Sequence, residues 1–352
     1  MMKKLNVCVL FGGVSSEHDI SEISASAVLE NIDREKYNVY PVGITADGRW
    51  FFYDGDIASI RNHEWEERAS AQAIISPDRG DSALLRLDGG RVEKIHIDVV
   101  YPVLHGKNGE DGTVQGLCTL AGIPCVGSGI IGSAVCMDKC VAKILFEKAG
   151  IPQAAWIEYK SGDTLDCELI EKKLGYPCFI KPSSAGSSVG VTKASNRAEL
   201  EKGIKLALEN DYKVLIEESI DAREVECGVM GNFEPVTADV LGEIKPAKEF
   251  YDFEAKYEDE ASKLVIPAEL DGETTEKIKE YARRAYRICE CRGYSRVDFF
   301  IDRRDGRIIL NEINTIPGFT PISMYPKVWE KSGYPMKAVI DKHIELAVSR
   351  ED

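Results

Sequence analysis

The sequence has little of what marks an exported or membrane-bound protein. None of its ten cysteines forms a C-x-x-C pair, and most lie in apolar runs, where a thiol behaves as a small hydrophobic side chain. No apolar run reaches the ~18 residues that a membrane-spanning helix needs, and the N-terminus lacks the pattern of a signal peptide. We therefore expect a cytoplasmic protein with reduced thiols and no contact with a membrane.

Positive charge is also scarce. The 352 residues include 44 lysines and arginines against 59 aspartates and glutamates, which gives a net charge of −15. Nucleic acids and anionic membranes require a dense basic surface, so this balance argues against both as general partners. A local basic cleft for one nucleotide remains compatible with an acidic exterior. With 44% hydrophobic residues, the chain can form two or three compact units.

The glycine turn after the first predicted strand lacks the dinucleotide fingerprint G-x-G-x-x-G, which makes a dinucleotide-dependent dehydrogenase a poor candidate. The chain opens with a predicted strand, Leu5 to Phe11, a glycine turn, Gly12 to Glu17, and a predicted helix from about Ser21 to Asn31. This order is typical of a doubly wound α/β unit. Further strands are expected at Tyr37 to Ile44 and Ile97 to Val103, whereas the polar residues 55–90 between them show no clear pattern.

Two polar loops follow predicted strands. His105 begins a glycine-rich loop at the carboxyl end of a buried strand, where α/β folds bind ligands, so it contacts a ligand or caps the turn. Lys181 ends a strand that begins at Pro177 and precedes the small-residue loop Ser183 to Gly190. Such a loop either brings backbone N–H groups close to phosphate oxygens or is a plain hairpin turn. It is not a Walker A loop, because its lysine precedes the glycines.

Acidic side chains lie inside two apolar runs near the C-terminus. Arg296 and Asp298 lie in the first run, Glu312 and Asn314 lie in the second, and the turn Asp302 to Gly306 joins them. Side chains two residues apart share one face of a strand, so a paired hairpin displays all four together. A solvated face is the alternative, but an unpaired carboxylate inside an apolar run is costly. Carboxylate and amide oxygens suit Mg²⁺, and we predict a metal site here.

The remaining pattern is a series of helices, strands and one long loop. Lys139 lies in the first turn of a predicted helix, where a cation is disfavoured unless an anion lies nearby. Residues 242–262 have no regular period, and their four aromatic side chains argue against disorder, so we predict a lid. The other expected elements are a helix at Cys136 to Gly150, strands at Val214 to Ile220, Val225 to Met230 and Val236 to Leu241, and helices at Gly272 to Cys289, Ser323 to Lys331 and Pro335 to Ser349.

The motifs resemble those of the D-alanine–D-alanine ligase family, within the ATP-grasp superfamily. The stretch Asn311 to Tyr325 is close to the family pattern, and five further blocks follow the family order over nearly the whole chain. These blocks are Phe11 to Glu17, His105 to Gly112, Met137 to Lys139, Lys181 to Gly190 and Glu254 to Tyr257. The resemblance implies an α/β ATP-grasp fold, with an N-terminal doubly wound α/β domain (1–128) and two α+β domains (129–220 and 221–352) that sandwich ATP.

The family reaction is the one that this resemblance implies. ATP phosphorylates the carboxylate of a first D-alanine, and the amine of a second D-alanine attacks the acyl phosphate, which supplies a precursor of peptidoglycan. A closing lid would exclude water from this labile intermediate. The resemblance also implies two Mg²⁺ ions, with Mn²⁺ as a substitute, and a homodimer formed through the first domain.

The resemblance further implies a role for individual residues of the nucleotide and metal sites. Asp298, Glu312 and Asn314 would hold the two metal ions, with Glu312 as the bridge. The expected ATP-binding residues are Lys139 and Lys181 at the phosphates, Lys256 of the lid at the γ-phosphate, Glu217 at the adenine amine with Ile220 nearby, and Glu224 at the ribose.

The implied substrate site uses residues from every part of the chain. The expected residues are Glu17 at the ammonium of the first D-alanine, Ser187 and Tyr257 as its link to the lid, His105 beside that site, Arg296 and the Gly318 backbone N–H as the oxyanion hole, and Ser323 at the carboxylate of the second substrate.

Two positions bear on the second substrate. Met324 stands where related ligases that accept D-lactate or D-serine often carry a basic residue, so its apolar side chain favours D-alanine. Phe253 lacks the hydroxyl that many members carry on the lid, and an apolar pocket discriminates a single hydroxyl by as little as ~100-fold. A D-alanine–D-serine ligase is therefore the alternative within the family, and a non-catalytic ATP-binding regulator is the alternative from another class.

Overall fold

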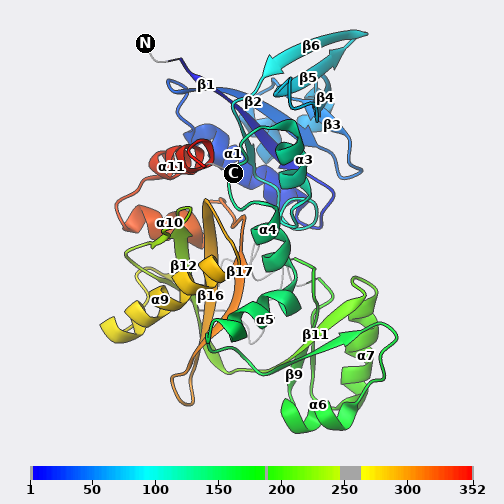
Figure 1. The fold of residues 1–352 in the computed structure, drawn as a ribbon, viewed down its shortest axis with the longest axis vertical. Coiled ribbons are helices and arrows are strands. Elements are labelled where there is room, and N and C mark those ends of the chain that lie inside the picture. Colours follow the sequence, from blue (N-terminus) through cyan, green and yellow to red (C-terminus); the bar gives the residue numbers. More distant parts are fainter. Residues whose placement is uncertain (1–2, 187–188, 246–262, 351–352) are drawn as a thin grey trace.

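The computed structural model describes residues 3–186, 189–245 and 263–350. The first of the three β-sheets forms the upper part of the molecule in Figure 1, the other two lie below it, and helices pack on each of them. Among the predicted site residues, Ser187, Lys256 and Tyr257 lie outside the described residues, and so does Phe253 of the predicted lid.

The first sheet has seven strands in the order β6-β5-β4-β3-β2-β1-β7. Its elements are β1 (Leu5–Gly12), α1 (His18–Asn31), β2 (Tyr37–Ile44), β3 (Trp50–Phe52), α2 (Ile57–Arg61), the 3₁₀ helix η1 (Trp65–Arg68), β4 (Ala71–Ile75), β5 (Ala83–Asp88), β6 (Arg91–His96), β7 (Val99–Pro102) and α3 (Thr113–Ala121). Strand β1 runs parallel to both β2 and β7. Val7 and Val9 enter one core with α1, whereas Cys8 and Leu10 enter the other core with α3. Helices therefore cover both faces of the parallel strands, as a doubly wound unit requires.

The stretch without a clear pattern in the sequence extends this sheet. It contains α2, η1, β4 and β5, and strands β3 to β6 continue the sheet in antiparallel pairs. Burial alternates along β4 but is almost absent along β6, whose residues are nearly all exposed. A strand at the edge of a sheet has little apolar surface to bury, which explains why its sequence carries no strong period.

The second sheet has four antiparallel strands in the order β10-β9-β11-β8. Its elements are β8 (Trp156–Lys160), α6 (Cys167–Lys173), β9 (Cys178–Pro182), β10 (Thr192–Ala194), α7 (Arg197–Leu208) and β11 (Lys213–Glu218). Apolar side chains of β9 and β11 pack with those of α6 and α7 in a separate core cluster. In Figure 1 this unit forms the lower right part of the molecule.

The single helix predicted for Cys136 to Gly150 is wrong. The structure has two helices here, α4 (Ile130–Met137) and α5 (Lys139–Lys148). Asp138 separates them with an extended backbone, and its Oδ1 accepts a hydrogen bond of 3.1 Å from the N–H of Val141. An aspartate in this position is a favourable N-cap, and it places Lys139 at the first residue of α5.

The third sheet has the order β15-β14-β12-β16-β17, with β13 beside β12. Its elements are β12 (Ala222–Met230), β13 (Val236–Thr237), β14 (Gly242–Lys245), β15 (Lys263–Val265), α9 (Gly272–Ile288), β16 (Tyr294–Asp302) and β17 (Ile308–Asn314). The predicted strand at Val236 to Leu241 is wrong beyond Thr237, because the N–H of Asp239 turns away to Ser332 Oγ at 2.9 Å. No helix among the described residues is long and apolar enough to cross a bilayer.

The last two helices return to the first sheet (Figure 1). They are α10 (Met324–Lys331) and α11 (Met336–Val348), and they share a core cluster with β1, β7 and α1. His343 is buried at this junction, hydrogen-bonded to the hydroxyls of Tyr101 at 2.8 Å and Tyr325 at 3.0 Å. Its ring stacks on Tyr294 with 3.9 Å between the centroids. The contacts tie together β7, β16, α10 and α11.

His343 is expected to make the protein less stable in mild acid. Burial lowers the pKa of His343 from 6.5 to about 3, so the folded state keeps the imidazole neutral while the unfolded chain binds a proton. Stability supplied by a neutral His343 is then complete above pH 6.5 and is lost as the pH falls toward 3, by about 1.4 kcal/mol per pH unit. Urea unfolding at pH 7, 6 and 5 should show that, as the pH is lowered, the free energy of unfolding falls more steeply in the parent than in His343→Gln. An equal decrease in both proteins would contradict this prediction.

Candidate active site

One pocket of about 680 Å³ lies among the three sheets. It is lined by side chains from the first domain, from the strands of the second sheet and from β12, β16 and β17 of the third. Every predicted site residue that the structure describes lines this one pocket. These are Glu17, His105, Lys139, Lys181, Glu217, Ile220, Glu224, Arg296, Asp298, Glu312, Asn314, Gly318, Ser323 and Met324.

The predicted metal hairpin forms with the expected pairing. In the antiparallel register of β16 and β17, Arg296 faces Asn314 and Asp298 faces Glu312, so the four side chains share one side of the sheet. Asp298 accepts hydrogen bonds from Arg296 at 2.8 and 2.7 Å and from Asn314 Nδ2 at 2.8 Å. Lys139 Nζ lies 3.9 Å from Glu312 Oε2. The carboxylates are thus compensated by neighbouring cations, and two carboxylates with an amide oxygen remain a suitable set for a hard cation.

Glu226 is a pocket residue that the sequence did not single out. The register of β12 and β16 places it opposite Asp298, and Arg296 Nε lies 3.0 Å from its Oε2. The spacing of Glu224 and Glu226 along one strand was the available signal, since side chains two apart share a face. Arg296 therefore lies between two carboxylates on neighbouring strands.

Two lysines approach the pocket from different elements. Lys139 Nζ donates to the carbonyl oxygen of Ala185 at 2.9 Å, which joins α5 to the loop after β9. Lys181 Nζ donates to Glu217 Oε2 at 2.9 Å. Burial would lower the pKa of Lys181, but the carboxylates of Glu217, Glu312 and Glu224 outweigh burial and raise it. Lys181 is consequently a permanent cation at the pocket wall.

Glu217 itself is almost completely buried and holds two lysines. Its Oε2 accepts from Lys181, and its Oε1 forms an ion pair with Lys143, a second residue that the sequence did not single out. Burial would raise the pKa of Glu217, but the ammonium groups of Lys143 and Lys181 lower it to about 2. Glu217 is therefore a carboxylate that accepts hydrogen bonds and cannot donate them.

Glu17 lies against two glycine-containing loops. A Cβ on Gly106, whose φ is +69°, would lie 2.7 Å from Glu17 Oε2, and a Cβ on Gly186 would lie 2.5 Å from the same oxygen. Only glycine allows an approach this close. The loop after β9 and the loop after β7 thus meet at one carboxylate, beside the pocket that all three line.

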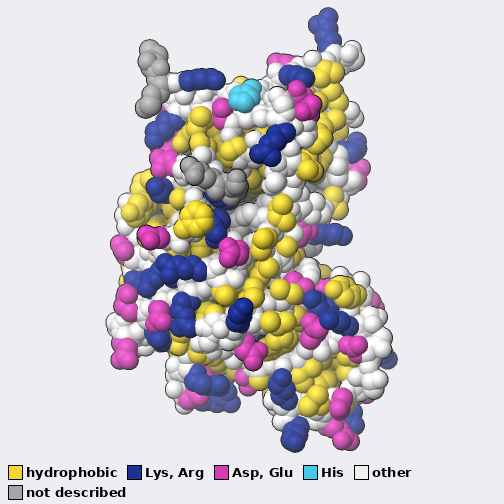
Figure 2. Space-filling model, in the orientation of Figure 1, with side chains coloured by type: hydrophobic (Ala, Val, Ile, Leu, Met, Phe, Trp, Pro, Cys, Tyr) yellow, Lys and Arg dark blue, Asp and Glu magenta, His cyan; other side chains and the backbone are white. Residues whose placement is uncertain are grey.

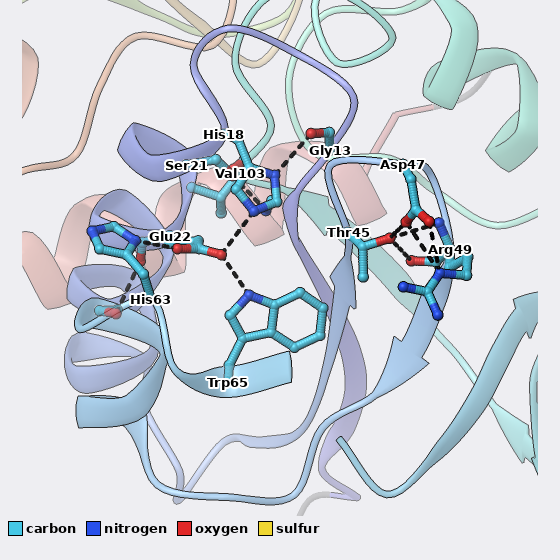
Figure 3. Close-up of polar contacts among 12 residues, drawn as sticks. Gly13, His18, Ser21, Glu22, Thr45, Asp47, Arg49, His63, Trp65 and Val103 are labelled. Atoms are coloured by element: carbon cyan, nitrogen blue, oxygen red, sulfur yellow. Dashed lines mark hydrogen bonds and ion pairs between the residues drawn. The ribbon is translucent and has the colours of Figure 1, made fainter. Parts of the chain in front are cut away.

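A polar network around the buried Glu22 supports the turn that carries Glu17 (Figure 3). His18 Nδ1 contacts the carbonyl oxygen of Gly13 at 2.9 Å, and its Nε2 contacts Glu22 Oε1 at 3.0 Å. Glu22 also accepts from His63 and Trp65, which come from the stretch without a sequence pattern. Burial would raise the pKa of Glu22, but these three hydrogen bonds lower it. Because both nitrogens of His18 face acceptors, its ring is an imidazolium, and its pKa is raised to about 9.

His105 connects the first domain to the loop after β17. Its Nδ1 lies 3.0 Å from the carbonyl oxygen of Ile316, and its Nε2 lies 3.0 Å from Ser24 Oγ, which accepts from the N–H of Phe319 at 3.2 Å. Burial would lower the pKa of His105, but Glu110 and Glu17 outweigh it and raise the pKa. His105 therefore orders the loop after β17 and also lines the pocket. This position is compatible with both predicted roles, contact with a ligand and capping of the turn.

The loop before α10 also lines the pocket. Ser323 Oγ accepts from the N–H of Thr320 at 3.0 Å, and a Cβ on Gly318 would lie 2.7 Å from the same oxygen. Met324 is buried against Gly242 of β14, where a Cβ would lie 2.0 Å from its sulfur. Met324 is thus a core residue as well as part of the pocket wall, so its position is set by packing.

The face of the molecule in Figure 2 carries charges of both signs. On the face shown in Figure 2, basic and acidic side chains are interspersed without a continuous basic surface. Lys139 and Lys181 lie instead inside the pocket, next to the carboxylates.

The chain matches two family models. The model described as D-ala D-ala ligase N-terminus matches residues 6–128, and the one described as D-ala D-ala ligase C-terminus matches residues 145–345. A D-alanine–D-alanine ligase from Ruminiclostridium cellulolyticum is 50% identical, over 99% of this chain and 96% of the relative. A D-alanine–D-alanine ligase from Clostridium acetobutylicum is 50% identical over 100% of both chains.

Solved structures agree with these relatives. The VanG D-Ala:D-Ser ligase from Enterococcus faecalis superimposes with a TM-score of 0.89 at 41% identity, over 98% of this chain and 100% of that one. The D-alanine–D-alanine ligase from Coxiella burnetii gives a TM-score of 0.87 at 34% identity, over 99% of this chain and 95% of that one. The chain therefore has the ATP-grasp fold and belongs to the D-alanine–D-alanine ligase family.

Proposed function

We propose that this protein is an ATP-dependent ligase that joins two D-alanine molecules for peptidoglycan precursor synthesis. The observation that carries the proposal is the meeting of all the described site residues in a single pocket. The full-length relatives at about 50% identity are D-alanine–D-alanine ligases, which favours the same pair of substrates.

The proposed reaction has two steps. A carboxylate oxygen of the first D-alanine attacks the γ-phosphorus of ATP, the bond to the β-phosphate oxygen breaks, and ADP leaves. The amine of the second D-alanine then attacks the acyl carbon, the bond from that carbon to the phosphate oxygen breaks, and the departing phosphate takes up the proton that the amine gives up. Glu17 holds the ammonium of the first substrate, and Arg296 with the Gly318 N–H stabilises the oxyanion. Ser323 binds the carboxylate of the second substrate.

The nucleotide is assigned to the other side of the pocket. Lys139 and Lys181 hold the phosphates, Glu217 and Ile220 the adenine, and Glu224 the ribose. Asp298, Glu312 and Asn314 would hold two Mg²⁺ ions, with Mn²⁺ as a possible substitute and Glu312 as the bridge. When bound, these ions neutralise the negative charge that develops on the transferred phosphoryl group.

The lid predicted for residues 242–262 is wrong at its start, because Gly242–Lys245 form strand β14. The lid is therefore assigned to residues 246–262, which lie outside the described residues. Lys256 would reach the γ-phosphate, and Tyr257 would connect through Ser187 to Glu17. The proximity of Gly186 to Glu17 supports this link, because it brings the residue before Ser187 next to the first substrate site. Closure would keep water from the acyl phosphate.

D-Alanine is the preferred second substrate in this proposal. VanG is a D-Ala:D-Ser ligase, so the fold supports both products. The full-length relatives at higher identity are D-alanine–D-alanine ligases, and Met324 presents an apolar wall in this pocket. Every described residue of the proposed metal and phosphate sites is present, and the full-length relatives are ligases, which makes a non-catalytic ATP-binding regulator less favoured. We also propose a cytoplasmic homodimer formed through the first domain.

The product spectrum tests the proposal. When the protein is incubated with ATP, Mg²⁺ and D-alanine, it should release ADP, phosphate and D-alanyl-D-alanine in equal amounts. With equal concentrations of D-alanine and D-serine, the D-alanine dipeptide should dominate by roughly tenfold or more, since the pocket has an apolar wall. L-Alanine serves as the control substrate. Absence of dipeptide would overturn the proposal, and a dominant D-alanyl-D-serine product would move the chain to the alternative.

A further inference from the structure

Lys143 is a buried cation that none of the roles above uses. It lies in the middle of α5, its side chain is only 2% exposed, and its Nζ forms an ion pair with Glu217 Oε1. An ammonium group buried to this extent requires a counter-charge, and Glu217 supplies it. The pair therefore belongs to the architecture of the base-binding end of the pocket.

The two lysines on Glu217 are not equivalent. The side chain of Lys181 is 17% exposed and lines the pocket, so it can turn to a phosphate oxygen. Lys143 lies behind Glu217, outside the set of residues that line the pocket. When nucleotide draws Lys181 away, Lys143 is the cation that stays on the buried carboxylate.

We propose that Lys143 is a specificity-determining residue that keeps Glu217 an ionised hydrogen-bond acceptor. The pocket therefore selects a purine with a 6-amino group over a purine with a 6-oxo group. The inference rests on the proposed contact between Glu217 and the base, and it adds the cause of the selection.

The selection follows from hydrogen-bond chemistry. A carboxylate accepts from an amino group but repels a carbonyl oxygen, whereas a neutral carboxyl group can donate to that oxygen. Burial alone would raise the pKa of Glu217, and the two lysines reverse this effect. Without Lys143, and with Lys181 turned to phosphate, burial would dominate and part of the population would become neutral.

The test compares ATP with inosine triphosphate, which carries a 6-oxo group. Dissociation constants are measured by competition against a fluorescent ATP analogue, and kcat/KM by release of nucleoside diphosphate. Lys143→Met keeps the length of the side chain and removes its charge. Its preference for ATP over inosine triphosphate should fall roughly tenfold, the size expected for one hydrogen bond to a charged group. Lys148→Met, at the exposed end of the same helix, should keep the parent preference.

The pH dependence provides a second readout. The parent preference should stay constant from pH 8 to pH 5.5, because Glu217 stays ionised throughout. In Lys143→Met the preference should fall further as the pH is lowered and Glu217 gains a proton. A parent preference that collapses over this range would overturn the inference without any variant, so the test survives even if Lys143→Met does not fold.

The outcomes separate the two proposals. An unchanged preference in folded Lys143→Met refutes the role of Lys143 and leaves the ligase assignment intact. A protein that shows the predicted binding preference but makes no dipeptide refutes the ligase assignment and leaves the role of Lys143 intact.

Discussion

Replacing Glu312 with glutamine is expected to lower kcat by roughly 1000-fold or more, the range seen when a charged group that stabilises phosphoryl transfer is removed. Glu312 faces Asp298 across the hairpin, so these two carboxylates lie on the same side of β16 and β17. Glutamine has the same shape but lacks the negative charge that a bridging ligand requires. The KM for D-alanine should change much less than kcat.

Binding measurements can separate this effect from damage to the fold. Titration of the ATP-loaded protein with Mn²⁺, followed by electron paramagnetic resonance, should show weaker binding in Glu312→Gln, while the unfolding midpoint changes little. Glu330→Gln, at an exposed position on α10, is the matched control and should behave as the parent. Normal turnover with normal Mn²⁺ binding in Glu312→Gln would place the metal site elsewhere.

Replacing Arg296 with lysine is expected to lower kcat by roughly 100-fold to 1000-fold, the loss measured when one oxyanion donor is removed. The guanidinium of Arg296 lies 2.7 and 2.8 Å from Asp298 and 3.0 Å from Glu226. Lysine keeps the positive charge between these carboxylates but lacks the planar fork that can hold a carboxylate and an oxyanion together. Affinity for ATP should change little in comparison.

Lysine is chosen so that the change in kcat does not arise from a loss of stability. Arg296→Met would leave two poorly exposed carboxylates without their cation, at a cost of about 3–5 kcal/mol. Chemical denaturation should therefore rank the parent and Arg296→Lys together, well above Arg296→Met. Arg303→Lys, on the exposed turn after β16, is the control for the substitution itself. A parent-like kcat in Arg296→Lys would remove Arg296 from the oxyanion hole.

The hairpin of β16 and β17 shows where sequence reasoning succeeds. Strand period and a short turn specify which side chains share a face, because both effects act within about twenty residues. Asp298 and Glu312 were therefore predicted together, and the register of β16 and β17 places them opposite each other. The break at Asp138 was also visible in principle, since aspartate before a helix is a favourable N-cap.

Lys143, Glu226, His63 and Trp65 show where sequence reasoning stops. Each is important for a partner far along the chain: Lys143 for Glu217, Glu226 for Arg296, and His63 and Trp65 for Glu22. A lysine in an amphipathic helix and a tryptophan in a polar stretch have no local period that reveals such a partner. Only the packing of separate elements brings these groups within hydrogen-bond distance.

Residue type and spacing along the chain were sufficient for the family, for most strands and helices, and for the choice of pocket residues, since these depend on local patterns and short motifs. Tertiary structure alone decided which charges neutralise each other inside the pocket. Burial raises the energy of every unpaired charge, so the folded chain must bring cations and carboxylates together from different elements. That pairing sets the protonation of Glu217 and the position of Arg296, and hence the chemistry that the pocket can perform.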